Sequence, residues 1–196
     1  MSQQPAGLTD WIAFLGRAEI PVLAHTVREL ERLHENEAQL NARAVADVVT
    51  DDPLMTVKLL RYMQMHKHRN QTHELVDVKQ TLLMMGLDTF FREVPPTPIA
   101  EDMLQEHRAA LVYLLHTVRR AQRSAYYAFD WALRLHDMHA EEVQVSALLT
   151  HMSEMLMWCF SPERMLEIQR LQAADRTMRS ADAQKLVLGF AGLELQ

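Results

Sequence analysis

The sequence has few of the residues that build β-structure, disulfide bonds and membrane spans. Its 196 residues include one cysteine, five glycines and 7% aromatic residues. All-β folds need many glycine-rich turns, so the shortage of glycine argues against a sandwich or a barrel. Cys159 has no second cysteine to pair with and lies in an apolar segment, which predicts a buried, inert thiol. No apolar run approaches the roughly 18 residues of a membrane span.

Missing motifs and the charge balance exclude further classes of function. The chain lacks a glycine-rich phosphate loop, a Gly-x-Ser-x-Gly elbow and a Cys-x-x-Cys pair. It carries 26 acidic and 20 basic residues, a net charge of −6 with histidine neutral. A protein that binds a phosphate backbone usually has a basic face, so we expect no nucleic-acid partner. The first residues lack the pattern of a signal peptide, so we expect a cytoplasmic protein without a membrane partner.

The residues that are present favour a soluble helical domain. Hydrophobic residues make up 48% of the chain and charged residues 23%, which excludes disorder over most of its length. Methionine occurs 13 times, and leucine, alanine, glutamate, glutamine and arginine are abundant, all of them good helix formers. We therefore predict an all-α fold.

Helix-start signals recur through the first half. Asn41 is expected to cap a helix that carries Val45, Val48 and Val49. Asp52 followed by Pro53 is the strongest start signal, because a capping carboxylate precedes proline in the first turn. Further starts are expected at Thr9 and Asp10, for a short helix through Gly16, and at Ile20-Pro21; a buried helix is expected over residues 78–87.

The second half begins at a proline-rich break. Three prolines in residues 95–98 remove backbone donors and force an extended chain, so we predict two packed helical subdomains, residues 1–94 and 95–196. A long helix is expected over residues 101–136 and a central apolar helix over residues 143–158. Glu141 and Glu142 suit the first turn of this central helix, where carboxylates are favoured by the helix dipole. Ser161-Pro162 and Ser180 are expected to open two further helices.

Several of these segments, in this order, resemble the HDOD family, the HD-related output domains of bacterial signalling proteins. The N-terminal segments are Ile20-Pro21 and Asp52-Pro53-Leu54, followed by residues 58–61 (KLLR) and the helix of residues 78–87, with its Met-Gly-Leu end. The C-terminal ones are residues 148–152 (LLTHM) and 187–190 (VLGF). The resemblance covers nearly the whole chain and implies a multi-helix HDOD-like fold with a role in signal transduction.

The same resemblance implies that the catalytic site of the parent HD family is degenerate here. HD phosphohydrolases hold a divalent metal with a histidine, an adjacent His-Asp pair and a distant aspartate. His116 lies at the first of these positions, whereas Thr150 and His151 replace the pair. A threonine hydroxyl is a poor ligand beside imidazole or carboxylate. Asp175 and Asp182 are the only candidates for the distant aspartate, so the resemblance implies an inactive site without metal or cofactor.

Each of the other clusters allows two interpretations: a binding function, or an ordinary role in the surface or the core. His136-Asp137 could bind a metal, but a solvated helix end is the ordinary alternative. Three histidines of one polar segment, His66, His68 and His73, could bind metal by chance, or form a surface loop. Arginines at 119, 120 and 123 could receive an anionic messenger, or be a solvated face. The methionines could line an adaptable groove, or fill the core.

We therefore expect a non-catalytic regulatory module that acts on other signalling proteins through direct contacts. The alternatives are a metal-dependent phosphohydrolase with an altered site, and a receiver for a nucleotide second messenger. Carboxylates within ligand distance of His116 would favour the hydrolase, and arginines lining a pocket would favour the receiver. An exposed apolar patch is predicted at residues 95–103, because a regulator needs an interface with a desolvated centre. The sequence does not set the oligomeric state.

Overall fold

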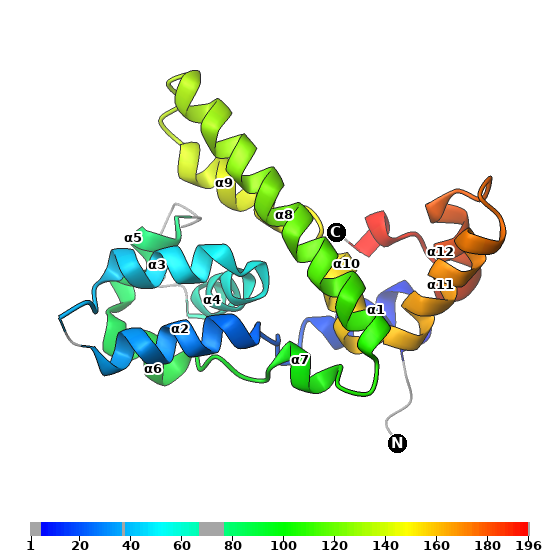
Figure 1. The fold of residues 1–196 in the computed structure, drawn as a ribbon, viewed down its shortest axis with the longest axis horizontal. Coiled ribbons are helices and arrows are strands. Elements are labelled where there is room, and N and C mark those ends of the chain that lie inside the picture. Colours follow the sequence, from blue (N-terminus) through cyan, green and yellow to red (C-terminus); the bar gives the residue numbers. More distant parts are fainter. Residues whose placement is uncertain (1–4, 37, 67–76, 196) are drawn as a thin grey trace.

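The computed structural model describes residues 5–36, 38–66 and 77–195. Within them, the predicted all-α fold is confirmed. The one β-type contact in these residues is an isolated parallel bridge between Val22 and Ile99. Figure 1 shows α2 to α6 on one side of the molecule, α1 and α10 to α12 on the other, and the long helix α8 running across both. The N-terminal helices are α1 (Leu8–Leu15), α2 (Ala24–Glu35), α3 (Ala42–Asp51), α4 (Pro53–Met65), α5 (Val78–Met85) and α6 (Leu87–Glu93).

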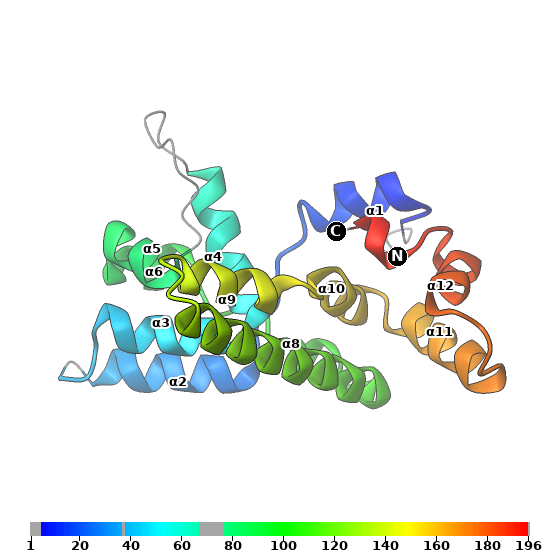
Figure 2. The ribbon, with the colours of Figure 1, turned by 90° about the horizontal axis from the view of Figure 1, so that it is seen from above.

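The second half is built around α8, which packs most extensively against α9 and α10. Figure 2 shows α9 and α10 following α8 along one side, with α11 and α12 beyond them. The elements are α7 (Ala100–Met103), α8 (Arg108–Arg134), α9 (Ala140–Leu149), α10 (Met152–Phe160), α11 (Pro162–Ala174), α12 (Ser180–Leu188) and the 3-10 turn η1 (Gly192–Leu195).

Two of the predicted caps are confirmed, and others are wrong. The Asn41 side chain accepts from the Ala44 amide at 2.9 Å, and Asp52 accepts from Leu54 and Met55. Helix α1, however, is capped at Gly7, two residues before the predicted start at Thr9. Ser161 precedes α11 as predicted, but its hydroxyl makes no capping bond. Ser180 is the first residue of α12 and not its cap.

Pro21 and the two long predicted helices also need correction. Pro21 lies before α2 rather than in its first turn, because the next residue is held in the bridge to Ile99: the Val22 amide donates to the Pro98 carbonyl, and the Val22 carbonyl accepts from the Ala100 amide. The helix expected over residues 101–136 is split into α7 and α8 by a turn at residues 104–107. The helix expected over residues 143–158 is broken at Thr150 and His151, so α10 takes a new direction.

The buried side chains form two clusters that do not follow the order of the chain. One contains residues of the N-terminal half, including Val49 and Phe90, together with Val145 of α9. The other contains residues of the second half together with Trp11 of α1, which is fully buried. Helix α1 therefore packs with the second half, although it comes first in the sequence. The division at residues 94 and 95 stays a prediction.

The chain passes between the two halves at a junction held by side chains of α4. Lys58, which is 6% exposed, donates from Nζ to Glu19 and to the Ile20 and Thr97 carbonyls. Arg61 donates to the Ala18 carbonyl at 2.7 Å. Asp52 completes the junction by accepting from the Leu23 amide and the Thr26 hydroxyl. We call Asp52, Lys58, Arg61 and their partners the junction network.

Candidate functional site

His116 lies on the outward face of α8 and not in the core. Its side chain is exposed, and it borders a shallow hollow of about 540 Å³ together with Arg119, Arg120 and Arg123. The next residue, Thr117, is the one that points inward: it is buried, and its hydroxyl contacts α10. His116 and His151 therefore do not meet in the core, because one residue along a helix turns a side chain by about 100°.

Thr150 and His151 occupy the break between α9 and α10. The exposed Thr150 hydroxyl donates to the Ser146 carbonyl at 3.1 Å, a bond that draws the hydroxyl back onto its own helix. His151 is half-buried, and its Nδ1 lies 4.0 Å from Oε2 of Glu154. The structure thus brings His151 towards a carboxylate of α10, while the Thr150 hydroxyl bonds to its own helix.

Glu154 is the centre of this region, and sequence reasoning missed it. Its Oε1 accepts from the Thr117 hydroxyl at 3.1 Å, and its Oε2 lies 2.7 Å from a guanidinium nitrogen of Arg120. These contacts join α10 to α8 across 34 and 37 positions of sequence. The signal in the sequence was the spacing of His151 and Glu154, which places both on one side of a helical turn. Its partner Arg120 could be identified only from the fold.

The residues at these positions do not fit a divalent metal. The carboxylate nearest His151 is already neutralised by Arg120, and a guanidinium at that distance would repel a cation. Among the described residues, no three histidine, cysteine or acidic side chains gather as a metal site would require. Asp175 bonds the amide and hydroxyl of Thr177, which lowers the pKa of its carboxyl group, and Asp182 lies on the exposed first turn of α12.

A small pocket opens beside this cluster, between α10, α11 and α12. It has a volume of about 290 Å³, and His151 and Glu154 form its polar side. Met157, Met165 and Leu188 form its apolar side, and all three also belong to the second-half core. Of the methionines for which a groove or a core role was considered, Met55, Met155 and Met157 lie in the core, whereas Met65 and Met84 are exposed.

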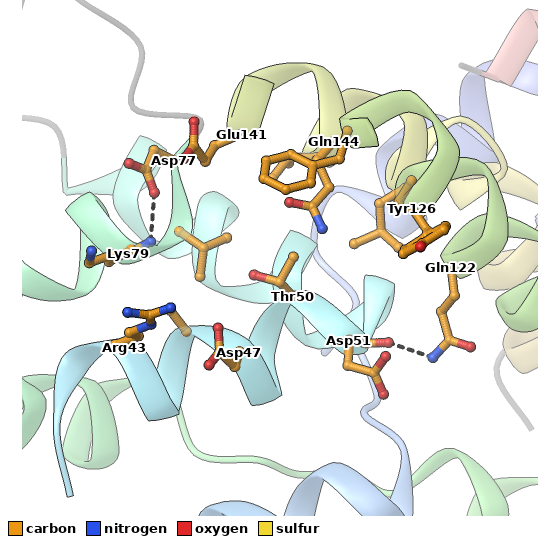
Figure 3. A pocket seen from close by; sticks show the side chains of 16 residues that line it. Arg43, Asp47, Thr50, Asp51, Asp77, Lys79, Gln122, Tyr126, Glu141 and Gln144 are labelled. Atoms are coloured by element: carbon orange, nitrogen blue, oxygen red, sulfur yellow. Dashed lines mark hydrogen bonds between the residues drawn. The ribbon is translucent and has the colours of Figure 1, made fainter. Parts of the chain in front are cut away.

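A larger cleft lies between the two halves of the molecule, where α3 and α5 face α8 and α9 (Figure 3). Its volume is about 600 Å³. Tyr126 and Phe129 form one wall, and Arg43, Asp47 and Lys79 line the other. The side chain of Gln122 donates to the Asp51 carbonyl at 2.7 Å and bridges the cleft at one end. No local pattern in the sequence indicates this cleft, because its lining comes from four separated segments.

The His136-Asp137 pair agrees with the ordinary interpretation, whereas the cluster of three histidines is described only at His66. His136 has a φ of 55° just after α8, and Asp137 accepts from the His139 amide, so this pair forms a turn at an exposed helix end. His66 ends α4 with its Nδ1 2.8 Å from the Tyr62 carbonyl. His68 and His73 lie outside the described residues. Cys159 is buried as predicted, and burial raises the pKa of its thiol to about 12.

The apolar patch expected at residues 95–103 is only partly present. Ala100 is buried and Met103 is 36% exposed, with charged Asp102 between them. A larger exposed apolar surface, which the sequence analysis missed, lies at the end of the α8–α9 hairpin. We call it the hairpin tip; its members and exposed fractions are Tyr126 (67%), Tyr127 (58%), Trp131 (67%), Leu133 (53%), Leu135 (81%) and Met138 (88%).

In the described part of the chain, none of the helices is both long enough and apolar enough to cross a bilayer.

Comparison with known proteins agrees with the fold. The chain is similar to the crystal structure of a virulence factor from Campylobacter jejuni subsp. jejuni, with a TM-score of 0.68 and 18% identity. That match covers 96% of this chain and 65% of the other, so our chain spans less than two thirds of its neighbour's length. No curated protein matches the chain.

The family is shown by the sequence itself. The model of the HDOD domain matches residues 20–195, which include Asp52, Lys58 and Arg61 of the junction network and all but the last residue of the second half. The match takes in Asp52-Pro53, Lys58 and Arg61, which carried part of the resemblance and which bond to residues 18–23 in the structure. The chain belongs to the HDOD domain family.

Proposed function

We propose that this HDOD domain is a non-catalytic regulatory module, which acts on other signalling proteins in the bacterial cytoplasm through direct contacts. Its family is one of signalling-related HD-type domains. The observation that carries the non-catalytic part is the ion pair between Arg120 and Glu154 beside His151. A phosphohydrolase of the HD type needs a metal there to activate water. A carboxylate already bound to arginine offers that metal neither a free charge nor a free oxygen.

The hairpin tip supports the part of the proposal that concerns contacts. Interface centres are rich in tyrosine, tryptophan and arginine, the residues that account for most of the energy of association. Tyr127 and Trp131 are more than half exposed, and Arg123 lies one turn before them on the same helix. An exposed surface of this composition on a folded domain favours a binding role.

The alternative of a second-messenger receiver has less support. Every residue that borders the hollow at Arg119, Arg120 and Arg123 belongs to α8. A single helix surface cannot enclose a nucleotide, whereas ligand pockets of that size bury most of their ligand. The arginines therefore form an open basic surface and not a closed pocket.

The test is metal content and turnover of the purified chain, with an active HD phosphohydrolase as the positive control. After exposure to manganese, iron, zinc and magnesium and then gel filtration, we expect no stoichiometric metal by elemental analysis. We also expect no hydrolysis of cyclic dinucleotides, nucleotides or simple phosphate esters. One metal per chain, with turnover that is lost in Glu154→Gln, would overturn the proposal and support the altered-site hydrolase.

A matched pair of variants tests the role given to the ion pair. Arg120→Ala frees Glu154, so titration with Mn²⁺ is expected to show tighter binding than in the wild type. Arg119→Ala removes an exposed arginine with no acidic partner among the described residues, so it is expected to leave Mn²⁺ binding unchanged. Equal behaviour of the two variants would show that Arg120 is not what keeps a cation away.

A further inference from the structure

Four exposed side chains of α8 form one ridge on the outside of the molecule. They follow one another every four residues, and we call them the α8 ridge: Arg119, Arg123, Tyr127 and Trp131. Helices α9 and α10 pack along the other side of α8 and leave this ridge exposed (Figure 2). A ridge of residues four apart is the surface that one helix packs into the groove of another.

The first half of the α8 ridge carries free positive charge. Among the described residues, Arg119 and Arg123 have no carboxylate within ion-pair distance, whereas their neighbour Arg120 is paired with Glu154. The hollow of about 540 Å³ at these arginines is bordered only by side chains that can donate a hydrogen bond, and none of them is acidic. This half of the ridge therefore suits carboxylates.

The second half of the α8 ridge is aromatic and carries no net charge. Tyr127 is 58% exposed and Trp131 is 67% exposed. Asp130 beside them is paired with Arg134 of the same helix, so these two charges cancel. Large aromatic side chains contribute most to association when an apolar side chain of a partner covers them. The ridge thus offers a basic contact at one end and an apolar contact at the other.

We propose that the α8 ridge docks an acidic amphipathic helix of another protein. Two carboxylates of that helix, one turn apart, pair with Arg119 and Arg123, whose guanidinium groups can each bind a carboxylate through two hydrogen bonds. A long apolar or aromatic side chain of the same helix packs on Tyr127 and Trp131. The ridge is about 18 Å long, which a helix of three to four turns covers. This inference rests on the proposed function, because it names the kind of partner for the contact proposed there.

The distribution of charge favours a short acidic helix over other occupants. A second copy of the ridge would bring two net-positive surfaces together, which disfavours association. Helix α8 carries five arginines and one aspartate, a net charge of +4, and since the whole chain carries −6, the rest carries −10. The charge of a nucleic acid or an anionic membrane extends beyond the ridge and meets this acidic remainder. The charge of a short helix ends with the ridge.

The first test is a selection from displayed random peptides of about 16 residues, a length that covers the ridge as a helix, against the full chain. The double variant Arg119→Glu, Arg123→Glu serves for counter-selection, so that only peptides that need the ridge are kept. We expect these peptides to carry net negative charge and an aromatic or long aliphatic residue within about two helical turns of the acidic ones. No binding peptide at all, or binders without net negative charge, would overturn the inference.

Variants then locate the binding of the tightest acidic peptide, measured by fluorescence anisotropy. Arg123→Glu and Trp131→Ser are each expected to weaken binding by about tenfold or more, as loss of a hot-spot residue does. The matched controls are Arg176→Glu and Leu186→Ser, at exposed residues outside the ridge, which are expected to leave binding unchanged. Circular dichroism verifies that all variants are folded. Equal losses in a ridge variant and its control would contradict docking on the ridge.

A charge exchange tests the pairing at the basic end. A second peptide carries lysine in place of each acidic residue of the first, and we expect it to bind the wild type about tenfold more weakly or worse. The double variant Arg119→Glu, Arg123→Glu is expected to reverse this preference and bind the lysine peptide better than the acidic one. A preference that does not reverse would show that carboxylates do not pair with these arginines.

The competing occupants are measured with the same protein. The probes are a single-stranded thymidine oligonucleotide, phosphatidylcholine vesicles that contain phosphatidylserine, and a second copy of the chain in sedimentation equilibrium. We expect each to associate more weakly than the acidic peptide. Tighter association of any of them, lost in Trp131→Ser, would overturn the inference in favour of that occupant.

The outcomes separate this inference from the proposed function. Peptides that need the ridge but carry no net negative charge would overturn the acidic partner and leave a role in protein contacts in place. Metal-dependent hydrolysis would overturn the non-catalytic role and leave the binding of acidic helices to the ridge unaffected.

Discussion

The junction network and the hairpin tip are opposite in what they bury. The junction buries charged side chains, whereas the tip exposes apolar ones. At the junction, the charged groups of Asp52 and Lys58 are buried, and every bond they make joins segments far apart in the sequence or caps a helix. At the tip, Trp131, Leu135 and Met138 are exposed to water, although each would gain from burial. The buried charges define the fold, and the exposed apolar side chains remain available for contacts.

This difference explains where the family resemblance lies. The Asp-Pro signal begins α4, and the same aspartate holds the start of α2 through the Leu23 amide and the Thr26 hydroxyl. Burial raises the pKa of Asp52, against four hydrogen bonds that favour the carboxylate. These bonds hold the starts of α2 and α4 together, whatever the domain binds. In the hairpin tip, by contrast, Trp131, Leu135 and Met138 are exposed to water and are free to serve one particular contact.

The largest expected effect is the loss of Asp52. Asp52→Ala leaves the buried amides of Leu23 and Leu54 without an acceptor, and each buried unsatisfied donor costs about 1–3 kcal/mol. We expect the free energy of unfolding, measured in urea, to fall by about 3–5 kcal/mol. The neighbouring Asp51 has an exposed side chain, so Asp51→Ala is the control and should stay within about 0.5 kcal/mol of the wild type.

The pH dependence of this effect has a definite sign. The folded chain binds the Asp52 proton at a higher pH than the unfolded chain, because burial raises the folded-state pKa above 3.8. The stabilisation from this group therefore grows as the pH falls towards 3.8 and is lost as the pH rises through the folded pKa. The stability difference between wild type and Asp52→Ala should widen on acidification, and a difference that narrows would contradict the assignment.

Lys58 is expected to have the second largest effect. Lys58→Met keeps most of the side-chain volume but leaves the Ile20 and Thr97 carbonyls without their donor, so we expect a loss of about 2–3 kcal/mol. Lys79→Met, at an exposed lysine, controls for the change of residue type. If urea unfolding shows the two methionine variants to be equally stable, the junction network does not hold the two halves together.

The fold could be predicted from the sequence where the cause of an element is local. The caps at Asn41 and Asp52 and the break at residues 95–98 depend on neighbouring residues, and the structure contains all three. The break at Thr150 and His151 was missed because the apolar pattern continues through it. Its cause is the packing of α10 against α8, which takes α10 out of line with α9.

At the candidate site, the sequence predicted only which metal-binding residues of the HD family are replaced. The sequence showed that Thr150 and His151 replace a metal-binding pair, but not that His116 faces outward. Glu154 and Arg120 were invisible as a pair, because they are 34 positions apart and meet only when α10 packs on α8. The cleft of Figure 3 depends in the same way on four segments that no local signal connects.

The smallest expected effect on stability is at the hairpin tip, and tryptophan fluorescence can measure it. The chain has three tryptophans: Trp11 and Trp158 are fully buried, while Trp131 is 67% exposed. Trp131→Phe is expected to change the free energy of unfolding of the monomer by no more than about 0.5 kcal/mol. The same substitution should remove nearly all fluorescence that iodide quenches in dilute solution. Quenching that persists in Trp131→Phe would show that Trp11 or Trp158 is accessible to iodide, which would contradict the difference in exposure between the hairpin tip and the core.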